Sequence, residues 1–162
     1  MPSKSSPSSK DSLRQLVRNK EYVAAREIIE RDYRLHEGAL WFHDLAGDVY
    51  GEIGLFEKAC AEYGKAIKLD PSDVELRIVR AAIVLADLHD YDRAIVLFQE
   101  IMDEMPASPD VFWYLARAYY TNGVAKARRI VDDGLAQFPK DEDLSRDSEY
   151  YAEVWQWLDR DP

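Results

Sequence analysis

The sequence has few cysteines and no long apolar stretch. Cys60 is the single cysteine among 162 residues, which excludes an intrachain disulfide and any metal site built from several cysteines. The longest unbroken apolar runs are six residues, at 81–86 and 111–116, whereas a membrane-spanning helix needs about 20. We therefore predict that the chain does not insert into a membrane.

Basic residues are also fewer than acidic residues. The chain holds 21 Lys and Arg residues against 31 Asp and Glu residues, a formal net charge of −10 at pH 7. Such an acidic surface repels phosphate groups, so we expect no nucleic-acid partner. The first ten residues, MPSKSSPSSK, lack the apolar stretch of a secretory signal. We therefore expect a cytoplasmic protein in which residues 1–10 form a disordered Ser/Pro/Lys tail.

The residue groupings that catalysis requires are scarce. No histidine lies three or four residues from another histidine or from the cysteine, so metal-ligand spacing is missing. His43 and Asp44 are adjacent and point to different sides of a helix, and the Asp44–Asp48 pair lacks a partner that would shift its acidity. The glycines are isolated, so there is no phosphate-binding loop. We predict no enzyme activity, no cofactor and no metal.

Helical periodicity fills the sequence from residue 11 onward. Apolar residues recur three and four positions apart, as at Ile95, Phe98 and Ile101, and no alternating stretch is long enough to indicate a strand. A longer pattern recurs after 33 to 35 residues, with a large residue, one or two small residues and an aromatic residue or leucine in a first helix, then an alanine, a large residue and a proline. Its three copies are His43, Ala46, Gly47, Tyr50, Ala59, Tyr63, Pro71; Ile78, Ala81, Ala82, Leu85, Ala94, Phe98, Pro106; and Phe112, Leu115, Ala116, Tyr119, Ala127, Val131, Pro139.

This pattern resembles the tetratricopeptide repeat (TPR) family, whose repeat of about 34 residues forms two helices. The resemblance implies an all-α fold, a right-handed solenoid of antiparallel helix pairs. We expect one domain over residues 11–158, with a degenerate repeat at 11–37, clear repeats at 40–73, 75–108 and 109–140, and a capping helix at 141–158. Small residues are expected where paired helices cross, and stacking is required because one repeat cannot bury its own apolar face.

In this family the first helix of each repeat lines a concave groove that binds partners. The resemblance places ten residues there: Trp41, Asp44, Asp48, Glu52, Val79, Ile83, Asp87, Trp113, Arg117 and Tyr120. Acidic residues stand where a clamp for a chaperone's C-terminal carboxylate needs Lys, Asn and Arg, so no such clamp is expected. We predict a peptide partner with basic and apolar residues. The structural alternative is that the acids are ordinary solvated surface and that Trp113 packs between repeats.

These features predict a non-enzymatic protein–protein interaction adaptor or scaffold, with a chaperone-like role as one form of it. The alternative is a structural assembly protein that forms a homo-oligomer through its ends. Residues 1–34, with 8 basic and 5 acidic side chains, would pair with the acidic remainder of a neighbouring copy, and Trp155 and Trp157 would dock on it. Tyr150 and Trp157 lie off the inner stripe of the last helix, which suggests a second binding face or a dimer contact.

Overall fold

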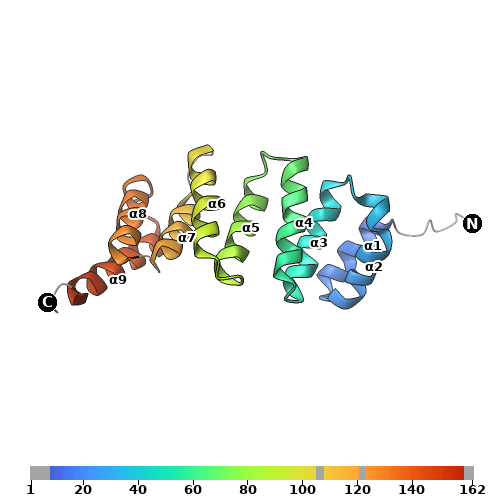
Figure 1. The fold of residues 1–162 in the computed structure, drawn as a ribbon, viewed down its shortest axis with the longest axis horizontal. Helices are drawn as coiled ribbons and strands as arrows, with labels where there is room; N and C mark the ends of the chain where they lie inside the picture. The colour runs from blue at the N-terminus through green and yellow to red at the C-terminus, as the bar shows by residue number, and fades with distance from the viewer. Residues whose placement is uncertain (1–7, 105–107, 121–122, 159–162) are drawn as a thin grey trace, which may run out of the picture. The chain divides into compact units, whose positions relative to one another are not determined.

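The computed structural model describes the backbone of residues 8–104, 108–120 and 123–158, and the side chains of these residues up to position 154. The described residues form nine helices and no strand, which confirms the predicted all-α fold class (Figure 1). The helices are α1 (Ser9–Arg18), α2 (Tyr22–His36), α3 (Leu40–Glu52), α4 (Phe56–Leu69), α5 (Val74–Ala86), α6 (Tyr91–Glu104), α7 (Pro109–Tyr120), α8 (Val124–Gln137) and α9 (Glu142–Leu158).

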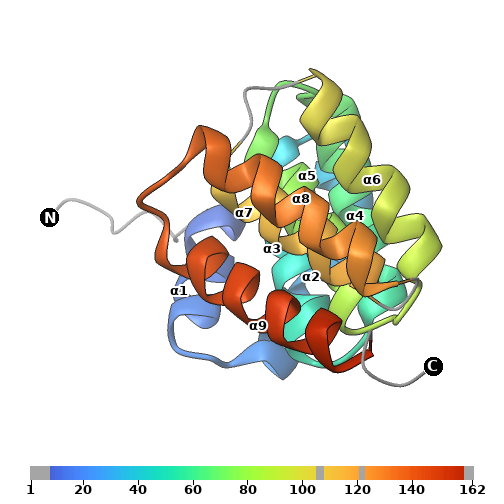
Figure 2. The same cartoon turned by 90° about the vertical axis from the view of Figure 1, so that its left-hand side faces the viewer.

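The chain divides into two compact units, residues 1–83 (unit 1) and 84–162 (unit 2), which are described separately. In unit 1, α1 packs on α2, α2 on α3 and α3 on α4, with short turns between them. In unit 2, α6 packs on α7, α7 on α8 and α8 on α9. Figure 2 shows α8 and α9 side by side, and α9 also contacts α7. Each unit is therefore built from neighbouring helices in chain order.

Side-chain caps and a glycine turn set several helix ends. Ser8 accepts a hydrogen bond from the backbone N–H of Asp11, so α1 begins at Ser9, inside the segment that the sequence predicted to be a disordered tail. Residues 1–7 of that tail lie outside the described residues. Gly54, between α3 and α4, has a φ of +75°, a left-handed conformation that glycine adopts without strain. Asp141 caps α9 by accepting a hydrogen bond from the backbone N–H of Leu144 at 2.9 Å.

The core of unit 1 gathers apolar side chains from α1 to α5. Its buried members are Leu13, Ala25, Ile29, Phe42, Ala46, Val49, Tyr50, Ala59, Tyr63, Ala66 and Leu76. Gly47 lies against the Tyr63 ring so closely that an added Cβ would be 2.7 Å from it. This contact explains why a residue without a side chain stands where α3 crosses α4, as the repeat pattern predicts.

The core of unit 2 extends from α6 to α9. Its buried apolar residues include Phe98, Ile101, Val111, Phe112, Leu115, Ala116, Val131, Leu144 and Tyr151. Leu144 is fully buried and anchors the start of α9 on the unit. The side chains of Trp155 and Leu158, near the end of α9, lie outside the described residues. Within the described part of the chain, no helix combines the length and the apolarity needed to span a membrane.

Candidate partner-binding site

Unit 2 contains a pocket of about 750 Å³, whose walls come from the end of α5, the turn after it, the start of α6, α7 and α9. Three predicted groove residues on α7, Trp113, Arg117 and Tyr120, lie in its lining. They are three and four positions apart, so helical spacing puts them on one face of α7. The opposite wall is formed by residues of α9: Arg146, Asp147, Tyr150 and Tyr151.

The aromatic rings of this pocket support one another. Tyr120 stacks on Tyr151 with a centroid distance of 5.4 Å, and the hydroxyl groups of Tyr120 and Tyr150 are 3.1 Å apart. Trp113 meets Tyr114 edge-on at 4.8 Å. Burial raises the pKa of Tyr151 to about 12, and the nearby Asp147 carboxylate adds to the shift, so this phenol stays protonated at neutral pH. The pocket therefore offers a preformed aromatic surface with attached hydroxyl groups.

Charged groups lie beside these rings. The guanidinium of Arg117 is 4.4 Å from the centroid of the Trp113 ring, a cation–π contact. Burial raises the pKa of Asp147, although the charges of Arg146 and Arg117 oppose that shift. Arg146 also donates a hydrogen bond to Asp143, one turn earlier on α9. The described lining thus holds two guanidinium groups and one carboxylate.

The predicted acidic residues form a second feature, in unit 1. Asp44, Asp48 and Glu52 are spaced about one helical turn apart along α3, and we call them the acidic face of α3. Burial raises the pKa of Asp44, and the Asp48 carboxylate raises it further. Burial also raises the pKa of Asp48; a hydrogen bond from the Tyr63 hydroxyl at 2.6 Å opposes this shift, whereas Glu52 adds to it. These carboxylates repel one another, so a cation placed beside them would be stabilised.

The other predicted groove residues have different surroundings. Trp41, Val79 and Ile83 are partly buried and pack against the unit 1 core. The ring of Trp41 lies 4.9 Å from that of His36. Asp87 is exposed and is not among the lining residues of the unit 2 pocket. The ten predicted residues therefore fall into two sets, one in each unit, and the structure brings three of them together in one pocket.

The sequence did not predict that α9 contributes to the pocket. Tyr150 was expected to mark a separate surface, yet it is a lining residue of the pocket with 49% of its surface exposed. The signal was present in the spacing, because Asp147 precedes Tyr150 and Tyr151 by three and four positions. The side chains of Trp155 and Trp157 lie outside the described residues, so their predicted role in docking stays a prediction.

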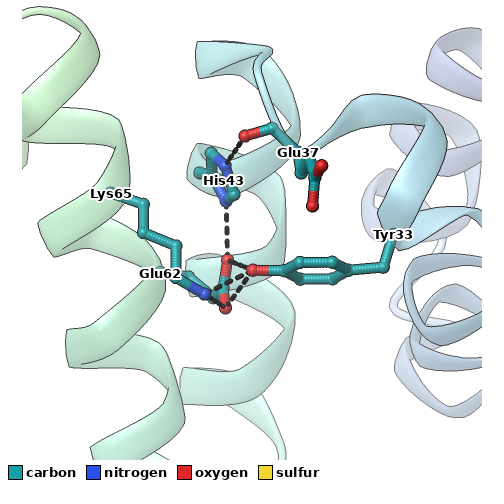
Figure 3. A network of polar contacts seen from close by, with 5 residues as sticks. All are labelled: Tyr33, Glu37, His43, Glu62 and Lys65. Carbon is teal, nitrogen blue, oxygen red and sulfur yellow. Dashed lines mark hydrogen bonds and ion pairs between the residues drawn. The ribbon is translucent and has the colours of Figure 1, made fainter.

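A buried polar network in unit 1 was also missed (Figure 3). Both ring nitrogens of His43 are 2.7 Å from an acceptor, Nε2 from the Glu37 carbonyl oxygen and Nδ1 from the Glu62 carboxylate. Glu62 also accepts hydrogen bonds from the Tyr33 hydroxyl at 3.1 Å and from Lys65 at 2.8 Å. His43 is only 2% exposed. Both polar atoms of this buried ring therefore have partners within the unit, as buried polar groups in folded proteins usually do.

The network joins three helices of unit 1 and has a structural explanation. Tyr33 comes from α2, His43 from α3, and Glu62 and Lys65 from α4. Burial raises the pKa of Glu62, but the hydrogen bonds from Lys65, His43 and Tyr33 together outweigh it and leave the pKa below its ordinary value. The sequence signal was an acidic residue on the buried stripe of α4, between Ala59 and Ala66. No three His, Cys, Asp or Glu side chains among the described residues are grouped so as to hold a metal ion.

Comparison with known proteins identifies the repeat. Residues 85–146 match the family model described as tetratricopeptide repeat. No curated protein matches the chain significantly. Among solved structures, residues 41 to the end of MamA from Desulfovibrio magneticus RS-1 superpose with a TM-score of 0.71 at 15% identity, covering 96% of this chain and 96% of that chain.

Two further solved structures share the fold. A tetratricopeptide repeat protein from Parabacteroides merdae ATCC 43184 has a TM-score of 0.74 at 18% identity, over 94% of this chain and 59% of that chain. PilW, described as a widely conserved type IV pilus biogenesis factor, has a TM-score of 0.65 at 15% identity, over 91% and 74%. At such identities the likeness shows the fold. Residues 85–146 therefore carry tetratricopeptide-repeat sequence, and most of the chain has the fold of tetratricopeptide-repeat proteins, as the repeat pattern predicted.

Proposed function

We propose that the chain is a non-enzymatic protein–protein interaction adaptor or scaffold that binds partner segments carrying apolar and basic residues. The unit 2 pocket carries this proposal, because it is concave and lined by Trp113, Tyr120 and the tyrosines of α9. Trp, Tyr and Arg are the residue types that contribute most often to binding hot spots. The fold supports the proposal, since repeat proteins use such concave surfaces to hold partners.

The acidic face of α3 is the proposed contact for basic residues. The Asp48 carboxylate raises the pKa of Asp44, and the Glu52 carboxylate raises the pKa of Asp48, so a Lys or Arg side chain beside them would relieve this repulsion. Asp48 is the least available of the three, because it accepts the hydrogen bond from Tyr63. Asp44 and Glu52 are therefore the residues to change in a test. A chaperone-like role is one form of this proposal, in which the pocket shields apolar segments of a partner.

Binding to an array of blocked peptides with varied sequence tests the proposal. The wild-type chain should retain peptides that are rich in apolar and basic residues. Trp113→Ala should lose the apolar preference, and Asp44→Asn with Glu52→Gln should lose the basic preference. A matched control is Glu27→Gln with Glu75→Gln, which removes the same charge from exposed positions on α2 and α5.

The outcomes separate the two contacts. Loss of the basic preference in the control pair as well would mean that total charge, rather than the acidic face of α3, attracts basic peptides. Retention of all peptides by Trp113→Ala, with helical content unchanged by circular dichroism, would mean that the pocket is not the binding site.

A further inference from the structure

The unit 2 pocket is rich in hydrogen-bond donors. Arg117 and Arg146 can only donate, and Asp147 is the single carboxylate among the lining residues that the structure describes. This leaves a local positive balance in a chain whose formal net charge is −10. A negatively charged ligand group would find complementary charge here, and electrostatic complementarity of this kind favours one partner over another.

Arg117 is the cation best placed to meet such a group. Its side chain is exposed, and its guanidinium is held 4.4 Å from the centroid of the Trp113 ring. Asp147 is near enough for the Arg117 charge to oppose the rise of its pKa. Arg146, in contrast, already donates to Asp143. A guanidinium that is oriented by a ring beneath it loses less entropy when it binds a carboxylate.

The Trp113 ring lies beside that guanidinium and is a lining residue of the pocket. Its indole Nε1–H is buried, so the ring would meet a ligand through its apolar surface. A carboxylate next to an apolar group therefore matches this part of the pocket.

We propose that the unit 2 pocket binds an acidic–apolar element of a protein partner, in which an Asp or Glu side chain meets Arg117 and an adjacent bulky apolar side chain packs on Trp113. A side-chain carboxylate fits better than a chain terminus. Arg117 is flanked on α7 by Trp113, four residues before it, and by Tyr120, three residues after it, so aromatic surface lies on both sides of the carboxylate. This inference rests on the proposed function, because it assumes that the pocket binds a partner chain.

Nuclear magnetic resonance titration of the full chain tests this inference. The probes are a hexapeptide with blocked ends and a central Phe-Asp pair, its Phe-Asn and Phe-Lys versions, and a version whose only carboxylate is a free C-terminus. The indole signal of Trp113, assigned with Trp113→Phe, reports occupancy of the pocket. We expect the Phe-Asp peptide to bind about threefold to tenfold more tightly than the Phe-Asn peptide, and the Phe-Lys peptide to bind most weakly.

Two variants and a control assign the preference to Arg117. Arg117→Gln should make the Phe-Asp and Phe-Asn peptides bind equally, and Arg117→Lys should keep part of the preference. Arg129→Gln removes an exposed arginine of α8 outside the pocket lining and should change nothing. The inference is overturned if the preference for Asp survives in Arg117→Gln. It is also overturned if the Phe-Lys peptide binds as tightly as Phe-Asp, or if the free C-terminus binds more tightly than the side-chain carboxylate.

Failure of this inference can be told apart from failure of the proposed function. If the array peptides whose binding depends on Trp113 carry no carboxylate, the proposed adaptor function is supported. The inference that the pocket binds an acidic–apolar element is then overturned. If no array peptide depends on Trp113 and no hexapeptide shifts its signal, both are overturned.

Discussion

Gly47 illustrates how a single residue sets the approach of two helices. An added Cβ would lie 2.7 Å from the ring of Tyr63, which is buried and whose hydroxyl is bound to Asp48. We expect Gly47→Ala to lower the free energy of unfolding by about 1–3 kcal/mol, because the ring has to shift within a packed core. Gly38→Ala is the matched control, since a Cβ at Gly38 meets nothing within 4 Å. Urea denaturation of both variants is the measurement, and equal loss in the two would contradict this account.

Glu62 gives a prediction of pH dependence. Its folded pKa is below the ordinary value, so the stability that its ionised form contributes is present above the unfolded pKa of about 4.3 and is lost as the pH falls through the folded pKa. We expect Glu62→Gln to destabilise unit 1 by about 2 kcal/mol at pH 7. The difference from wild type should shrink as the pH falls below about 4.

Chemical denaturation at several pH values measures this difference. Glu27→Gln, an exposed change on α2, should show no such trend. A gap between wild type and Glu62→Gln that stays constant down to the lowest pH would mean that the carboxylate charge is not what stabilises the network.

For single residues, the sequence predicted which small side chains are buried better than it predicted which polar side chains bind one another. The small residues at the helix crossings were predicted because the repeat pattern specifies them, and Ala46 and Ala59 are fully buried as expected. The His43 network was missed because Tyr33 and Glu62 come from helices 10 and 19 residues away from it, and such contacts depend on packing between helices. The only signal of such contacts in the sequence is a charged residue, here Glu62, on the buried stripe of a helix.

At the scale of helices, α9 links stability to the proposed binding pocket. Its first turn is fixed by the Asp141 cap and by the fully buried Leu144, and its next turns carry Asp147, Tyr150 and Tyr151 into the pocket wall. A helix that is fixed at one end holds these side chains in place only as long as that end stays formed. The cap and the pocket are therefore expected to be coupled.

Asp141→Ala tests this coupling. Loss of the cap should cost about 1 kcal/mol of stability and should increase backbone hydrogen exchange in the first turns of α9. Glu142→Ala is the control, because it alters an exposed first-turn residue and leaves the Asp141 hydrogen bond intact. If both variants increase exchange equally, charge near the helix start rather than the cap holds α9.

The helices themselves were largely predictable, and the role of the last helix was not. The repeat pattern predicted helix pairs because its small residues, alanines and prolines each have a fixed place in the pair. The pattern specifies no residues for a helix after the last repeat. It therefore could not predict that Arg146, Asp147 and Tyr150 line the pocket. The Ser/Pro/Lys composition suggested a disordered tail through residue 10, whereas Ser8 caps α1, which begins at Ser9.

At the scale of the whole molecule, the alternative of end-to-end assembly makes a distinct prediction. If the basic residues of 1–34 paired with the acidic remainder of other copies, the mean mass in sedimentation would rise with protein concentration and fall with added salt. A monomer with a net charge of −10 would instead keep a constant mass, because copies repel one another. We expect the constant mass, and a rise that salt reverses would support assembly in place of the adaptor.

The same net charge predicts how partners reach the chain. A charge of −10 attracts basic peptides over distances set by the ionic strength, so their association rate should fall severalfold between about 50 and about 500 mM salt. The dissociation rate should change little for peptides held mainly by apolar contact with the pocket, since those contacts are not screened. Stopped-flow fluorescence with a basic–apolar peptide and its neutral–apolar version measures both rates.

Asp44→Asn with Glu52→Gln should reduce the salt dependence of the association rate more than Glu27→Gln with Glu75→Gln. Both pairs alter the total charge equally, but only the first pair lies on the acidic face of α3. Equal reduction by both pairs would mean that the charge of the whole molecule, and not this face, guides basic partners.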